Sequence, residues 1–145
     1  MTTIKNRFGT TAAIIAGALL AALPTAGNAQ NTVERTGAAN SPIASLAFVP
    51  AGADIMFVSG TTPSPVGPAK PDGLGDTKAQ TLSILTKMKA SLEAKGFGMG
   101  DIVKMTVFLV GTPATGGKMD SAAMNEVFRT FFGRAEQPNK PTRST

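Results

Sequence analysis

The stretch that decides the fold reads Asp-Ile-Val-Lys-Met-Thr-Val-Phe-Leu over residues 101–109. Its β-branched and aromatic residues predict a strand over residues 102–110. Successive side chains of a strand point to opposite faces. One face therefore carries an apolar row that we expect to lie under helices, namely Val103, Met105, Val107 and Leu109. The other face mixes Lys and Thr with Ile, Phe and Val, which indicates contact with another subunit.

One helix is predicted before this strand and one after it. Asp76 or Thr77 can cap the first helix, and Gly96 ends it. Its apolar residues recur at spacings of three and four and form one stripe. They are Ala79, Leu82, Leu85, Met88 and Leu92. The second helix is predicted from about Lys118 to Phe132.

Further strands are predicted earlier in the chain. Residues 45–49 and 55–59 are rich in strand-forming residues, and the segment between them would make the pair a hairpin. Residues 32–36 are a candidate short edge strand, and an extended segment begins at Pro141. The Pro- and Gly-rich residues 61–75 predict a long surface loop. This order predicts an α+β domain in which two helices cover one face of a mixed sheet.

The first 29 residues have the layout of a secretory signal peptide. Two basic residues give a positive start, and the apolar run of residues 12–23 is shorter than the roughly 20 residues that a membrane-spanning helix needs. A proline breaks the run, and small residues precede a predicted cleavage after Ala29. An uncleaved anchor and a buried core helix are the alternatives. We therefore expect a secreted or periplasmic protein with its folded domain at residues 30–145 and no membrane attachment after cleavage.

The composition excludes several kinds of chemistry. The chain has no Cys, His, Tyr or Trp, which rules out a Ser-His-Asp triad, a Cys nucleophile and an ordinary zinc site. We expect neither a metal nor a cofactor. Removal of Lys5 and Arg7 with the leader leaves twelve basic and nine acidic residues, a net charge of +3. The lysines are scattered without an aromatic platform, so we expect no nucleic-acid binding.

Four short segments in a fixed order resemble a known family. They are Val58-Ser59-Gly60, residues 101–109, Met124-Asn125-Glu126-Val127-Phe128 and Pro141-Thr142-Arg143. Together they resemble the RidA/YjgF family, which hydrolyses reactive enamines and imines, and the likeness covers about residues 41–145. The resemblance implies a chorismate-mutase-like fold and a homotrimer with three clefts between subunits.

The resemblance also implies substrate-binding residues. Arg143 matches the arginine that pairs with the substrate carboxylate, a role that suits its planar fork of donors. Ser59 and Gly60 match the end of the strand beside the cleft, where a glycine allows close approach. Asn125 matches a helix position that reaches the same cleft. From the residues alone, a solvated arginine, a strand-ending turn and an asparagine on the wet side of a helix are open alternatives. Lys104 is either a cleft cation or a solvated strand lysine.

Two departures from the family pattern bear on activity. Leu46 stands about where many family enzymes carry a Tyr. The family also continues past the arginine into two strands, the later of which carries a Glu that orients or activates the hydrolytic water. This sequence ends at Thr145, so we expect a RidA-like domain without its last strands, and we assign no catalytic residue.

The resemblance leads to two functional hypotheses. The first is hydrolysis of small carboxylate-bearing imines or enamines derived from amino acids, of the 2-iminobutanoate/2-iminopropanoate deaminase type. The second is a non-catalytic, trimeric protein on the same scaffold that binds a small molecule or a partner. Turnover that depends on Arg143 is expected only from the first. A fragment that does not fold alone is a further alternative.

Overall fold

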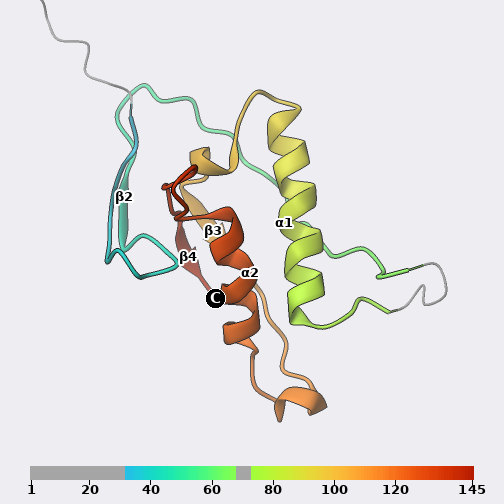
Figure 1. Cartoon of the computed structure of the whole chain (residues 1–145). Helices are drawn as coiled ribbons and strands as arrows, with labels where there is room; N and C mark the ends of the chain where they lie inside the picture. Colours follow the sequence, from blue (N-terminus) through green and yellow to red (C-terminus); the bar gives the residue numbers. More distant parts are fainter. Residues whose placement is uncertain (1–31, 68–72) are drawn as a thin grey trace, which may run out of the picture.

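The computed structural model describes residues 32–67 and 73–145, and the predicted signal peptide lies outside these residues. The described elements are β1 (Glu34–Thr36), β2 (Leu46–Phe48), α1 (Thr77–Glu93), β3 (Lys104–Thr106), α2 (Ser121–Phe131) and β4 (Thr142–Ser144). Two short 3₁₀ turns lie at Met99–Asp101 and Pro113–Thr115. β1 pairs antiparallel with β2, and β3 pairs parallel with β4 (Figure 1). The predicted α+β class is confirmed, but in place of one mixed sheet the described residues form two separate strand pairs, one antiparallel and one parallel.

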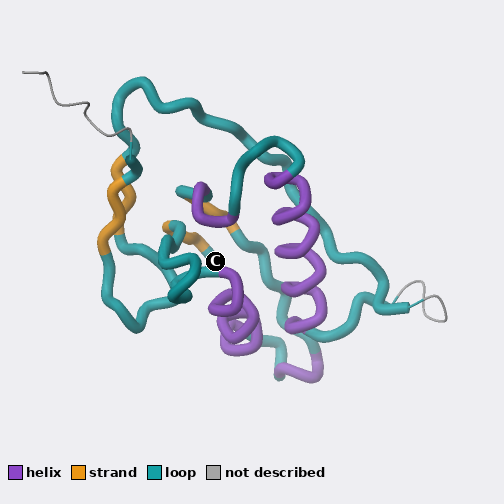
Figure 2. Tube along the Cα trace, turned by 45° about the horizontal axis from the view of Figure 1, so that its top comes forward, coloured by secondary structure: helices purple, strands orange, loops and turns teal. Residues whose placement is uncertain are grey.

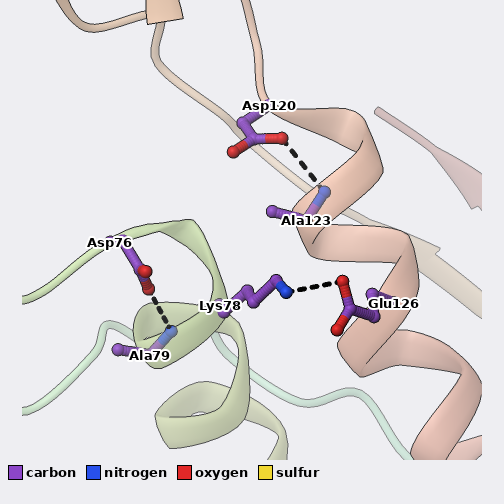
Figure 3. Close-up of polar contacts among 6 residues, drawn as sticks. All are labelled: Asp76, Lys78, Ala79, Asp120, Ala123 and Glu126. Carbon is purple, nitrogen blue, oxygen red and sulfur yellow. Dashed lines mark hydrogen bonds and ion pairs between the residues drawn. The ribbon is translucent and has the colours of Figure 1, made fainter. Parts of the chain in front are cut away.

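Helix α1 begins and ends where local signals place it. The Asp76 carboxylate accepts a hydrogen bond of 2.8 Å from the backbone N–H of Ala79 (Figure 3), which satisfies one of the free donors of the first turn. After the helix, Gly96 has φ +80°, a conformation that favours glycine. Leu85 and Leu92 of the predicted stripe are buried, whereas Leu82 is 51% exposed.

Helix α2 starts later than predicted. Its cap is Asp120, whose carboxylate accepts a hydrogen bond of 3.0 Å from the backbone N–H of Ala123, so the helix begins at Ser121. Lys78 of α1 and Glu126 of α2 form an ion pair of 2.6 Å between the two helices (Figure 3). The pair is exposed to solvent, so it contributes little to stability.

Both helices share one core with β3. Its buried members come from α1, from β3, from α2 and from the two turns that follow the helices, and they are Leu85, Leu92, Met99, Met105, Met124, Phe128 and Phe132. In Figure 2 the β1–β2 pair and helix α1 lie on opposite sides of β3 and β4. The predicted alternation of faces holds along β3, because Met105 is buried whereas Lys104 and Thr106 are exposed. It fails at Ile102, which was predicted on the other face and packs against the core. Within the described residues, no helix combines the length and the apolar character needed to cross a membrane.

The predicted hairpin of residues 45–49 and 55–59 is wrong. β2 pairs instead with β1, with Glu34 opposite Phe48, and residues 55–60 form no strand. A strand exists only where a neighbour accepts its backbone hydrogen bonds, and no described segment pairs with residues 55–60. Their apolar side chains therefore face solvent, with Phe57 92% exposed. For the same reason β3 covers only Lys104–Thr106, the length along which β4 pairs with it.

The β1–β2 pair is tied to the segment that leads into β4. The backbone N–H of Ala44 donates to the carbonyl of Pro141 at 3.0 Å. The ammonium of Lys140 donates to the carbonyls of Ala38, Ala39 and Ser41 at 3.0–3.2 Å. These bonds fix residues 140–141 and so set the direction in which β4 enters the sheet.

Candidate functional site

Strand β4 points Arg143 toward the helices. The backbone N–H of Thr142 donates to the carbonyl of Val103 at 2.9 Å, and the N–H of Val107 donates to the carbonyl of Ser144 at 2.9 Å. This register places Arg143 beside Met105. Side chains that are neighbours across a ladder point to the same face of a sheet. Because Met105 is in the core, Arg143 lies on the same face, under α2.

The Arg143 guanidinium is held by three uncharged groups. Its Nη2 donates to Oδ1 of Asn125 at 2.7 Å, and its Nε donates to Oγ1 of Thr145 at 3.1 Å. The guanidinium carbon lies 4.5 Å from the centre of the Phe128 ring, which is within the range of a cation–π contact. The head group is therefore fixed by an amide, a hydroxyl and an aromatic face.

No ion pair joins Arg143 to a carboxylate within the described residues. Desolvation by burial lowers the pKa of its guanidinium, but an arginine keeps its charge throughout the physiological range. The Nη1 atom is buried and makes no hydrogen bond within the described part of the chain. A buried donor without a partner costs about 1–3 kcal/mol. A bound carboxylate would remove this cost, since guanidinium and carboxylate match in charge and geometry.

Ser59 and Gly60 lie elsewhere. They belong to the segment that crosses from β2 to α1 (Figure 1), and they line an open hollow of about 2080 Å³ whose walls include α1 and β3. Neither Asn125 nor Arg143 is among the residues that line it. Of the four predicted site residues, the structure thus brings together Asn125 and Arg143 and leaves Ser59 and Gly60 apart from them.

Lys104 lies on the opposite face of the strand pair from Arg143. Its ammonium donates to Oγ of Ser144 at 2.6 Å, and it is exposed. Glu126 pairs with Lys78, and Glu136 pairs with Arg134 at 3.1 Å. Within the described residues no group of three or more acidic side chains is placed to hold a metal ion.

Phe128 is a site residue that sequence reasoning missed. It lies three positions after Asn125, a spacing that puts two side chains on the same side of a helix. That spacing was a usable signal once Asn125 was a candidate. Thr145 was missed as well, although it stands two residues after Arg143, on the same face of the extended chain.

The fold defines a class of protein: an α+β domain with two helices on one face of a parallel strand pair that carries Arg143. Residues 36–145 match the family model described as Endoribonuclease L-PSP. The chain belongs to this family, which is the RidA/YjgF family.

Named relatives are similar to most of the folded domain. A RutC family protein of Pyrococcus horikoshii is 34% identical over 84 residues, which is 57% of this chain and 60% of the relative. A proposed reactive intermediate deaminase of Escherichia coli, TdcF, is 37% identical over 90 residues, or 62% of this chain and 63% of the relative. A solved structure of a proposed endoribonuclease from Thermotoga maritima is 25% identical, with a TM-score of 0.42 over 77% of this chain and 80% of that one. The chain spans about 60% of the length of the curated relatives it matches.

Proposed function

We propose that this protein binds small carboxylate-bearing imines, or their enamine tautomers, and hydrolyses them to 2-oxo acids. The observation that carries the proposal is Arg143, a half-buried guanidinium with uncharged partners and a buried Nη1 donor that is free within the described residues. TdcF, whose name describes a reactive intermediate deaminase, supports the same chemistry. We further propose 2-iminobutanoate and 2-iminopropanoate as substrates, because each carries the carboxylate that Arg143 would bind.

The reaction is an addition of water followed by loss of ammonia. The water oxygen bonds to the carbon of the C=N group, and a water proton moves to the nitrogen. The proton of the new C–OH group then moves to the amine nitrogen, the carbon–nitrogen bond breaks, and ammonia leaves as the carbonyl of the 2-oxo acid forms. Arg143 would hold the carboxylate next to the reacting carbon and so fix the face that water attacks. The proposal assigns no residue to proton transfer.

Ser59 and Gly60 would shape the same cleft. Because the two pairs of residues lie apart in one chain, the proposal includes a homotrimer whose subunit contacts complete three clefts. It also includes export of the chain by residues 1–29, so that the protein would act in a secreted or periplasmic setting.

The experiment that tests the function follows release of the 2-oxo acid. An amino-acid oxidase acting on alanine would generate 2-iminopropanoate, and the rate of pyruvate formation would be compared with and without the purified chain. We expect the wild type to exceed the spontaneous rate and Arg143→Ala to match it. Arg134→Ala is the matched control, because Arg134 is exposed and pairs with Glu136. A wild type no faster than background, or an unchanged Arg143→Ala rate, would overturn the proposal.

A second candidate is binding without turnover. It is favoured by one observation: no carboxylate pairs with Arg143 within the described residues, so no acidic group is identified there as a partner for the reacting water. Saturable binding of pyruvate together with a background rate of imine hydrolysis would select this candidate. The same preparations would be tested on RNA, because the family description names an endoribonuclease.

A further inference from the structure

We propose that Asn125 and Phe128 are positioning residues that hold Arg143 ready for an anion, and that the neutral charge of Asn125 keeps the site able to accept one. The inference rests on the proposed function only in taking Arg143 as the group that binds the ligand carboxylate. It assigns Asn125 a contact with the arginine and not with the substrate.

The geometry of α2 supports these roles. Asn125 and Phe128 are three residues apart and face β4 together. The distance of 2.7 Å from Nη2 to the amide oxygen is typical of a short, charge-assisted hydrogen bond. The Phe128 ring is 1% exposed and packs against Phe132 with ring centres 4.4 Å apart. The ring therefore cannot follow the guanidinium, and it acts as a fixed platform under it.

The occupied atoms determine where a ligand can bind. Asn125 accepts a hydrogen bond from Nη2, and Thr145 accepts one from Nε. Phe128 covers one face of the guanidinium. The edge that includes Nη1 remains, and this atom is buried without a partner in the described part of the chain, so a carboxylate would reach it only after the groups that cover it shift. A carboxylate that reaches this edge is oriented by the geometry, because the guanidinium cannot rotate without losing all three contacts.

The side chain at position 125 then sets the charge of the site. Asparagine accepts the Nη2 hydrogen bond without neutralising Arg143. An aspartate at this position would be similar in size and would place a carboxylate at the same 2.7 Å from Nη2. Such a pair would compete with any bound anion, because opposite charges at this distance attract strongly in a partly buried site.

The test measures calorimetric binding of pyruvate to the full chain at pH 7 together with thermal unfolding. We expect Asn125→Asp to weaken binding by about tenfold or more with no loss of thermal stability. Asn125→Gln, which stays neutral and keeps an amide, should bind within a few-fold of the wild type. If Asn125 had only a structural role, Asn125→Asp would not bind pyruvate more weakly than Asn125→Gln.

Phe128 is tested against a neighbour with the same burial. Phe128→Leu and Phe132→Leu each remove a buried ring, at 1% and 2% exposure, so both should lower the unfolding temperature. Only Phe128→Leu should also weaken pyruvate binding, because only Phe128 contacts the guanidinium. Equal binding by both leucine variants, or wild-type affinity in Asn125→Asp, would overturn the inference.

The outcomes separate this inference from the proposed function. If pyruvate binding depends on residues 125 and 128 but the chain does not hydrolyse imines, the inference is supported and the proposed deaminase activity is refuted. If Asn125→Asp hydrolyses imines at the wild-type rate, the proposed deaminase activity is supported and the inference about Asn125 is refuted. Failure of the folded wild type to bind pyruvate at millimolar concentration overturns the inference as well.

Discussion

At the scale of single residues, Arg143 lies in an environment that suits a ligand better than it suits stability. Burial lowers the pKa of the guanidinium, and desolvation is the cause. The side chains that accept hydrogen bonds from the Arg143 guanidinium are uncharged. They are the amide of Asn125 and the hydroxyl of Thr145. Strained or unsatisfied groups of this kind are tolerated where function requires them. These features agree with the proposed role of Arg143 in binding a ligand carboxylate.

This view predicts the effect of an apolar substitution on stability. Arg143→Met removes a partly buried charge and an unpaired donor but keeps most of the contact with Phe128. We expect the free energy of unfolding in urea to stay within about 1 kcal/mol of the wild type or to rise, while pyruvate binding is lost. Because the arginine stays charged between pH 5 and 9, the difference should not depend on pH in this range. A loss of more than about 2 kcal/mol would show a structural role instead.

At the scale of elements, the helices form from local signals. Asp76 and Asp120 each accept a hydrogen bond from the backbone N–H three residues later, which fixes the first turn of α1 and of α2. The last turn of α1 closes on Leu92, whose carbonyl accepts from the N–H groups of Lys95 and Phe97 at 2.9 and 3.0 Å. These contacts involve residues close in sequence, so they form independently of the rest of the fold.

The caps predict a matched pair of variants. Asp76→Ala and Asp120→Ala should each lower the free energy of unfolding by about 1 kcal/mol, the usual worth of an aspartate cap. Asp54→Ala is the control, because Asp54 is exposed in the loop after β2. Urea denaturation measures all three. A cap variant as stable as the control would mean that packing alone defines that helix start.

The same distinction explains how much could be predicted from the sequence. Helix α1, the cores of β2 and β3 and the alternation of faces along β3 were predictable, because periodicity and caps are local. The pairing of strands was not, because a partner can come from any part of the chain. Residues 55–59 have strong strand propensity, yet no strand in the described part of the chain pairs with them. β4, in contrast, pairs with β3 across a separation of 38 positions, from Met105 to Arg143. For the site, the sequence indicated Asn125 and Arg143 through resemblance. The spacing of Phe128 from Asn125 placed both on one side of a helix, but the contact of Phe128 with the guanidinium depends on how α2 packs on β4.

At the scale of the whole molecule, apolar side chains remain exposed on one side of the strands. Ile55 and Phe57 of the unpaired segment are 67% and 92% exposed, and Phe108 and Val110 after β3 are 89% and 84% exposed. All four line the same open hollow. Large exposed apolar patches are uncommon on monomers and often belong to interaction sites. This apolar surface agrees with the predicted contact of this strand face with another subunit and with the proposed homotrimer.

The assembly can be tested at Phe108. Phe108→Asp should convert a trimer to monomers, because it places a charge in a surface that the proposed contact would bury. Thr86→Asp, on an exposed position of α1, should leave the mass unchanged. Light scattering on the purified chain measures both. A wild type that is monomeric, or a Phe108→Asp variant with the wild-type mass, would contradict the proposed assembly.

The Arg143 guanidinium can be observed directly while a ligand is added. In nitrogen-15 NMR spectra, the Nε and Nη signals of Arg143 are identified as those that are missing from Arg143→Met. These signals are then followed in the wild-type chain while 2-oxobutanoate is titrated in. We predict a saturable shift of these signals, because the ligand carboxylate would bond to Nη1 and satisfy the donor that is buried without a partner in the described residues. Signals that stay in place in a folded protein at millimolar ligand would show that Arg143 does not bind the carboxylate.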